Sequence, residues 1–265
     1  MTLGERILLA LSRAPDADDY AAAVQAPGLD GALDNLRRRF PDLAERVRGR
    51  RVLDFGCGAG WQAAALSRLG AAFVLGVDTN ERTLAGARES AAELGIGDDR
   101  LRYETRVPDD LRATFDVVVS QNAMEHFPDP AAILREMTAA LAPGGRLLVT
   151  FGPPWYAPSG SHMHFFTRVP WVNLLFSERT VMAVRARFRD DGARRYEQVE
   201  SGLNRMSLRR WERTVARSGL RMEARRYACV KGIDGLRHLP LLRELFVNNV
   251  SAVLAPQAVA DARHT

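Results

Sequence analysis

The sequence predicts an α/β fold built around one mostly parallel β-sheet. From residue 51 to residue 151, short apolar runs typical of buried strands alternate with segments of helical periodicity. The first of these runs, residues 52–55, breaks into a turn with glycine at three alternate positions, and a helical pattern follows at once. This order of strand, glycine turn and helix brings backbone N–H groups close to a ligand, because glycine has no Cβ. We therefore expect a ligand site at this turn.

The strands expected in this stretch share apolar, often β-branched sequences. They cover residues 52–55, 73–77, 101–104, 115–119 and 146–151. The helices between them are expected at about residues 61–69, 80–95 and 130–141. For the last of these helices, Asp129-Pro130 supplies an N-cap and a proline at the first helical position, and Pro143-Gly144-Gly145 supplies the end.

The rest of the chain follows other patterns. Residues 1–50 have the spacing of short helices, and we expect them to form a helical lid or packing segment. Residues 51–265 are expected to form the main domain, with an insertion at about 153–206 that begins as a loop rich in aromatic residues and histidine. The remaining expected elements are helices at 176–188, 208–217 (capped by Ser207) and 236–246, and strands at 220–230 and 247–254.

The composition is that of an ordinary globular protein. The chain has 265 residues, of which 46% are hydrophobic and 26% charged, enough for one sizeable core. No apolar run approaches the roughly 18–20 residues that span a bilayer. The chain has two cysteines, Cys57 and Cys229, which excludes a disulfide framework and fits a reducing cytoplasm, where we expect the protein.

Positive charge is concentrated in one region. Residues 168–231 hold 16 basic and 7 acidic residues, whereas the remainder holds 21 and 25. Such a region is most often only a solvated surface, but its asymmetry favours an anionic small-molecule substrate or an anionic surface as partner. Nucleic acid is not expected, because the sequence contains no recognised nucleic-acid-binding module. The sequence does not predict an oligomeric state.

The glycine turn distinguishes between two cofactors. The dinucleotide pattern G-x-G-x-x-G needs its third glycine where this chain has Trp61, whose bulk would hold the helix away from the strand. Here the third glycine is Gly60. The carboxylate of Asp78, after the second strand, suits two ribose hydroxyls, while Asp54 beneath the turn suits an ammonium group. Ribose and ammonium without a pyrophosphate favour S-adenosylmethionine, and an NAD(P)-dependent oxidoreductase is the alternative.

On these residues the chain resembles the class I S-adenosylmethionine-dependent methyltransferases, of the type 11 or type 23 kind. The matching motifs are Val52–Gly60, Gly76–Asp78, Phe115–Phe127 and Leu141–Gly145. The resemblance implies a Rossmann-like seven-stranded sheet of order 3-2-1-4-5-7-6 with the last strand antiparallel, and S-adenosylmethionine as cofactor. In this family an acidic residue after the third strand often meets adenine. Here that place holds Tyr103-Glu104-Thr105-Arg106, and Asp109 and Asp110 follow late, so the resemblance does not assign the adenine contact, which backbone groups could supply.

The cofactor-binding residues expected from the turn and the resemblance lie at the ends of three strands. They are Asp54, Phe55, Gly56, Cys57, Gly58, Gly60, Asp78, Thr79, Gln121 and Asn122. Cys57 is expected to be a small filler rather than a nucleophile, since no general base lies at a recognisable spacing. For Asp78, a helix N-cap is the rival interpretation.

The predicted reaction is methyl transfer to a small-molecule or glycan- or lipid-type acceptor, on oxygen or nitrogen. The candidates for a general base are His126, His162, His164 and Tyr156, with none preferred. His162 and His164 form an alternating pair, but a metal site needs three or four ligands, so no metal is expected. Acceptor specificity is expected in the insertion. A cofactor-binding partner subunit without activity is the alternative that the sequence leaves open.

Overall fold

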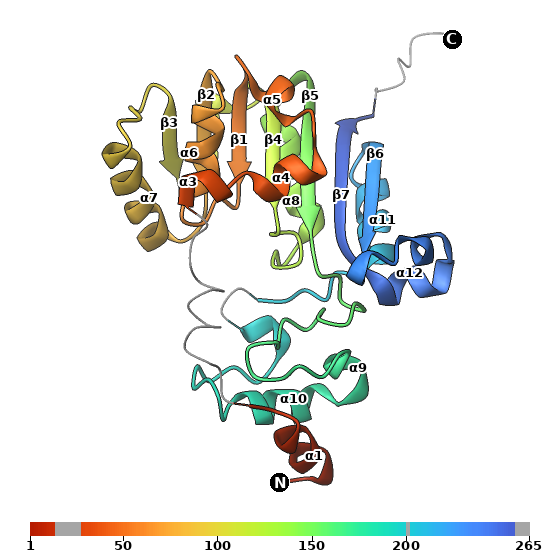
Figure 1. Ribbon diagram of the computed structural model, residues 1–265. Helices are drawn as coiled ribbons and strands as arrows, with labels where there is room; N and C mark the ends of the chain where they lie inside the picture. The colour runs from red at the N-terminus through yellow and green to blue at the C-terminus, as the bar shows by residue number, and fades with distance from the viewer. Residues whose placement is uncertain (14–27, 200–201, 258–265) are drawn as a thin grey trace.

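Seven strands form one sheet in the order β3-β2-β1-β4-β5-β7-β6 (Figure 1). The computed structural model describes residues 1–13, 28–199 and 202–257. Strands β1 to β5 pair in parallel, while β7 runs antiparallel to both β5 and β6. The predicted fold class, strand order and antiparallel last strand are confirmed. The strands are β1 (Arg51–Phe55), β2 (Phe73–Val77), β3 (Leu101–Glu104), β4 (Phe115–Gln121), β5 (Leu141–Phe151), β6 (Leu220–Cys229) and β7 (Val247–Pro256).

Helices cover both faces of this sheet, because successive strand residues point to opposite faces. Val52 of β1 packs in the core beneath one group of helices, and its neighbour Leu53 packs beneath the other. The first group consists of α3 (Gly28–Gly31), α4 (Asp34–Arg39), α5 (Leu43–Val47), α6 (Trp61–Arg68) and α7 (Glu81–Glu93). The second group consists of α8 (Pro130–Ala140) and α11 (Leu208–Arg217). The result is a three-layer α/β/α sandwich.

A separate apolar cluster forms beyond the carboxyl ends of the parallel strands (Figure 1). It contains α9 (Val172–Leu175), α10 (Glu178–Arg185) and the 3₁₀ turn Tyr196–Gln198, all from the insertion. The N-terminal helix α1 (Leu3–Ala10) joins them, because Leu8 is fully buried among Phe166, Val181 and their neighbours. We call residues 153–206 together with α1 the cap.

The segment 1–50 does not pack as one unit in the described residues. Its first helix, α1, packs against α10 of the cap, whereas α4 and α5 pack on the sheet core. Residues 14–27, which connect these parts in sequence, lie outside the described residues. The predicted domain boundary at residue 50 stays a prediction.

The cap is tied to the sheet by residues 202–206, which we call the strap. The side-chain amide of Asn204 donates to the backbone oxygens of Met124 and Phe127, each at 2.7 Å. Its backbone N–H donates to the oxygen of Glu125 at 2.9 Å. All three acceptors belong to the loop between β4 and α8. The strap therefore holds this loop through backbone groups.

Three sequence predictions of local structure were wrong. Strand β5 begins at Leu141 rather than at residue 146, because Leu141 already pairs with Phe115 before a register shift. The helix expected at 236–246 is a 3₁₀ turn, Asp234–His238, followed by α12 (Pro240–Phe246), since proline lacks an N–H and starts a new helix. The short α9 lies in a stretch expected to be irregular.

One ion pair in the cap should carry measurable stability. Arg185 is 1% exposed, and its guanidinium binds both oxygens of Asp191 at 2.6 and 2.5 Å. We expect Asp191→Ala to lower the free energy of unfolding by about 2 kcal/mol. This is less than the about 3–5 kcal/mol for a fully buried pair, because Asp191 keeps contact with water.

Chemical denaturation measures this loss, and Asp190→Ala, an exposed neighbour, is the matched control. The Arg185 hydrogen bond holds the pKa of Asp191 well below its usual range. The stabilisation is therefore present above about pH 4 and is lost as the pH falls further. Equal stability of the two variants near neutral pH would contradict the expectation.

Candidate active site

The glycine turn after β1 is bound to the end of β2. The backbone N–H groups of Gly56 and Cys57 both donate to the oxygen of Val77, at 2.8 and 3.0 Å. The N–H of Gly58 donates to Asp78 Oδ2 at 2.9 Å. These bonds bring together the two strand ends that carry the predicted cofactor residues.

The three glycines of the turn are needed for different reasons. All have left-handed backbone angles, with φ of 80°, 51° and 78° at Gly56, Gly58 and Gly60. A Cβ on Gly58 would meet no described atom within 4 Å, so this glycine borders open space. A Cβ on Gly56 would lie 3.2 Å from the Cβ of Ala123, in the loop after β4. Gly58 is therefore the position at which a ligand can approach the backbone.

Gly60 is required by packing. A Cβ there would lie 2.6 Å from the hydroxyl oxygen of Tyr103, on β3. That buried hydroxyl donates to the backbone oxygen of Gly60 at 2.8 Å. The Tyr103 ring also crosses Gly76, its register partner on β2, where a Cβ would lie 2.6 Å from the ring. Sequence reasoning missed Tyr103, although a glycine in β2 opposite a large aromatic residue in β3 is a usable signal.

Asp54 is a buried carboxyl with one unused oxygen. The residue is 1% exposed, and its Oδ1 accepts a hydrogen bond from Gln62 Nε2 at 2.6 Å. Its Oδ2 is buried and has no partner among the described residues. Burial raises the pKa of Asp54 to about 7; the bond from Gln62 opposes this rise and the charge of Asp78 adds to it. A buried carboxylate oxygen without a donor fits the ammonium group of S-adenosylmethionine.

Asp78 lies half-buried at the end of β2. Its Oδ2 accepts from Gly58, and its Oδ1 accepts from the backbone N–H of Asn80 at 3.0 Å. The N-cap of α7 is Asn80, whose side chain accepts from Thr83, so the rival interpretation of Asp78 as the cap was wrong. Each carboxylate oxygen keeps a lone pair for a ribose hydroxyl. Thr79, beside it, is exposed.

The remaining predicted cofactor residues lie around the same turn. Phe55 packs edge-on against Phe127, with ring centroids 6.0 Å apart. Burial, together with the charges of Asp54 and Asp78, raises the pKa of the Cys57 thiol, which therefore does not act as a thiolate nucleophile. Gln121 ends β4 with a buried Oε1 that has no partner among the described residues, and the backbone of Asn122 turns with φ of 52°.

The four general-base candidates separate into two pairs. The rings of His126 and His162 lie 5.4 Å apart, so the structure brings the loop after β4 and the cap together at these two residues. His164 and Tyr156 are exposed. His126 Nδ1 lies 2.8 Å from the backbone oxygen of Gly202 in the strap. Since a carbonyl oxygen only accepts, Nδ1 of His126 carries the proton of this bond.

His162 has a buried ring nitrogen without a partner. Its Nε2 has no hydrogen-bond partner among the described residues. Burial, together with the neighbouring His126 and His164, lowers the pKa of His162 to about 4. The imidazole is therefore neutral at physiological pH, with Nε2 ready to accept a hydrogen bond.

The described part of the chain has neither a candidate metal site nor a helix that could cross a membrane. No group of three or more histidine, cysteine, aspartate or glutamate side chains there could hold a metal ion. No helix in those ranges is long and apolar enough to cross a membrane.

Comparison with known proteins identifies the class. The family profile described as "Methyltransferase domain" matches residues 28–225. The chain therefore belongs to this family of S-adenosylmethionine-dependent methyltransferases, and S-adenosylmethionine is its cofactor. The alternative of an NAD(P)-dependent oxidoreductase is set aside by this match.

Two groups of similar proteins extend the comparison. The chain is 44% identical over 117 residues to ubiquinone biosynthesis O-methyltransferase of Neisseria meningitidis serogroup C. The aligned residues make up 43% of this chain and 48% of that protein. The chain is 34% identical over 119 residues to the protein of that name from Pseudomonas aeruginosa strain LESB58, 44% of this chain and 51% of the relative. The chain thus spans about half the length of the curated relatives it matches.

Among solved structures, the fold is similar to that of an S-adenosylmethionine-dependent methyltransferase from Mesorhizobium loti. The TM-score is 0.54 at 24% identity, over 86% of this chain and 99% of the other. It is also similar to the [4+2]-cyclase SpnF, with a TM-score of 0.55 at 16% identity, over 83% and 80% of the two chains. These likenesses concern the fold alone.

We expect cofactor affinity to fall as the pH drops through about 7. Below this pH the free protein holds Asp54 protonated, so an ammonium group binding there must expel a proton; above it, no proton is released. Calorimetry with S-adenosylhomocysteine, in two buffers of different ionisation enthalpy, measures affinity and proton release together.

The Asp54→Asn variant should bind about 10- to 100-fold more weakly, as expected for loss of a hydrogen bond to a charged group worth about 1.5–3 kcal/mol. It should also lose the pH dependence. Wild-type affinity that is equal at about pH 6 and about pH 8 would exclude this role for Asp54.

Paired alanine variants can distinguish the need for open space at Gly58 from the need for close packing at Gly60. Gly60→Ala adds a clash with Tyr103 to the strain of a left-handed alanine, and we expect it to lower the free energy of unfolding by about 2–5 kcal/mol. Gly58→Ala adds only the strain, about 1–2 kcal/mol, but fills the open side of the turn. Denaturation and S-adenosylhomocysteine binding measure the two effects, and the reverse order of stability would contradict them.

Proposed function

We propose that this chain transfers the methyl group of S-adenosylmethionine to a hydroxyl oxygen of a small-molecule acceptor. Family membership supports methyl transfer. The names of the curated relatives, O-methyltransferases over the half that they share, support oxygen as the accepting atom. Because the match covers only half of those relatives, their substrate is not carried over to this chain.

The observation that carries the proposal is the unpartnered Nε2 of His162. A buried acceptor without a donor costs about 1–3 kcal/mol unless a ligand supplies the donor. In the neutral tautomer that carries its proton on Nδ1, Nε2 of His162 holds a lone pair. A hydroxyl group of the acceptor supplies the missing donor, and its oxygen is then aimed at the reaction.

The residues divide the remaining tasks. Asp78 and the Gly58 backbone would hold the ribose side of the cofactor, and Asp54 its ammonium group. S-adenosylmethionine, when bound, supplies an electrophilic methyl group. His162 would take the hydroxyl proton at Nε2 when the methyl–sulfur bond breaks and the methyl group passes to the acceptor oxygen; the products would be an ether, a neutral thioether and a protonated His162. Alignment of the acceptor within the cap contributes up to about 7–11 kcal/mol, and the proton transfer about 10²–10⁴-fold.

The acceptor can be identified by incubating the protein with labelled S-adenosylmethionine and a metabolite extract. The labelled product should be an O-methyl ether, as determined by mass spectrometry and NMR. Transfer to nitrogen, or to a glycan or lipid, would replace the proposed acceptor class. No transfer at all, with cofactor binding intact, would favour an inactive partner subunit.

We expect His162→Ala to lower kcat by about 10²–10⁴-fold while S-adenosylhomocysteine binding stays unchanged. His238→Ala, which changes an exposed histidine outside the cap, is the matched control. Because the neutral imidazole is the active form and the pKa of His162 is lowered to about 4, kcat of the wild type should stay level from about pH 8 to about pH 5 and fall only below that. A fall centred at about 6.5, the ordinary histidine value, would point to another base.

A further inference from the structure

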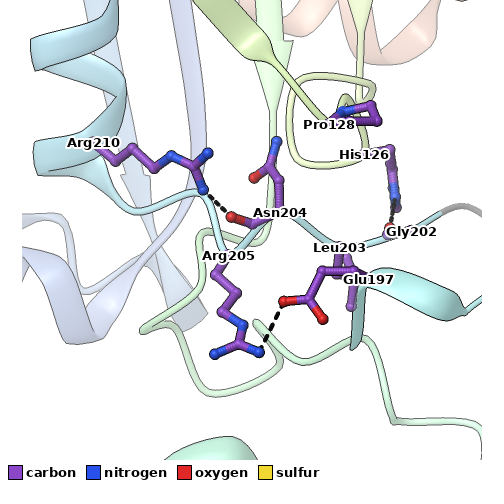
Figure 2. A pocket seen from close by; sticks show the side chains of 8 residues that line it. All are labelled: His126, Pro128, Glu197, Gly202, Leu203, Asn204, Arg205 and Arg210. Carbon is purple, nitrogen blue, oxygen red and sulfur yellow. Dashed lines mark hydrogen bonds and ion pairs between the residues drawn. The ribbon is translucent and has the colours of Figure 1, made fainter. Parts of the chain in front are cut away.

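A pocket of about 510 Å³ lies where the strap meets the loop after β4 (Figure 2). This volume is within the range of about 300–1,000 Å³ that small-molecule sites occupy. The strap forms its floor with Gly202 and Asn204, and α11 contributes Arg210. Figure 2 shows Arg210 and His126 on opposite sides of the strap residues.

The pocket shares a wall with the proposed methyl-transfer site. His126, which lines it, faces the ring of His162 at 5.4 Å. The same loop carries Ala123, which would lie 3.2 Å from a Cβ on Gly56 of the cofactor turn. A molecule in this pocket would therefore contact His126, whose ring lies next to that of His162, and the loop that borders the cofactor turn.

The two arginines of the pocket differ in how their charge is balanced. Arg205 binds both Glu178 and Glu197, at 3.0 and 2.9 Å, so its positive charge is more than balanced by these two carboxylates. The guanidinium of Arg210 donates to the backbone oxygen of Asn204 and forms no ion pair with any carboxylate in the described ranges. Among the described lining residues, Arg210 is therefore the cation that no carboxylate of the described ranges pairs with, and its guanidinium has further N–H donors.

We infer that Arg210 binds an oxyanion, a carboxylate or a phosphate group, of the methyl acceptor in this pocket. A planar guanidinium presents two parallel N–H groups to such an anion. The acceptor is then a small molecule with a hydroxyl group to be methylated and an anionic group that Arg210 holds. That the bound molecule is the methyl acceptor rests on the proposed function. The affinity of the pocket for an oxyanion can be measured without turnover.

The test compares two aromatic anions with a neutral aromatic amide. With the full chain saturated by S-adenosylhomocysteine, ligand-detected NMR measures the binding of benzoate, phenyl phosphate and the neutral isostere benzamide. At least one anion should bind ten or more times tighter than benzamide, and the preferred anion tells a carboxylate site from a phosphate site. A tenfold difference corresponds to about 1.4 kcal/mol.

Matched variants assign the effect to this pocket. Arg210→Gln should remove the tenfold preference for the anion, Arg210→Lys should keep part of it, and S-adenosylhomocysteine binding should not change in either. Arg213→Gln, an exposed arginine on the same helix, should behave as wild type.

Equal binding of benzoate, phenyl phosphate and benzamide, no binding of either anion, or the same loss in Arg213→Gln would overturn the inference. A chain that binds the anion through Arg210 but transfers no methyl group would leave the pocket assigned and contradict only the proposed function.

Discussion

The candidate active site of this protein depends on the hydrogen bonds that join the glycine turn after β1 to the end of β2. Val77 accepts from two successive backbone N–H groups of the turn, and Asp78 accepts from a third. These bonds use the polar groups that a tight turn would otherwise leave unpaired, and they orient the Asp78 carboxylate. Tyr103 supports the turn from the neighbouring strand β3, by a hydrogen bond to Gly60. The cofactor residues are thus positioned by backbone geometry.

Two buried polar atoms of the candidate site have unsatisfied hydrogen-bonding capacity. Asp54 Oδ2 and His162 Nε2 both lack hydrogen-bond partners among the described residues. Burial raises the pKa of Asp54 and lowers the pKa of His162, and each shift favours the neutral form of the side chain. The first belongs to an acid near the carboxyl end of β1, and the second belongs to a base in the cap. Such atoms are unfavourable in a free protein, and under the proposed function a ligand would bring a cation to one and a hydroxyl to the other.

The shared fold does not by itself specify a reaction. Proteins with this fold include both methyltransferases and a cyclase, so the sheet alone does not specify the reaction. In this chain the cap contributes His162, and the strap contributes Asn204 together with one wall of the Arg210 pocket. The strap is held to the loop after β4 by hydrogen bonds to backbone oxygens. A change of side chain in that loop therefore leaves the contact largely in place.

The sequence by itself determined the strands, the glycine turn and the acids Asp54 and Asp78, because periodicity, glycine spacing and strand ends are local features. It did not determine the support of Gly60 by Tyr103, the pairing of His126 with His162, or the pocket around Arg210. Those contacts join residues that are far apart in the chain, and no local pattern specifies them. Only the packing of the cap and strap against the strand ends, in three dimensions, decided which of the histidines and arginines lie at the site.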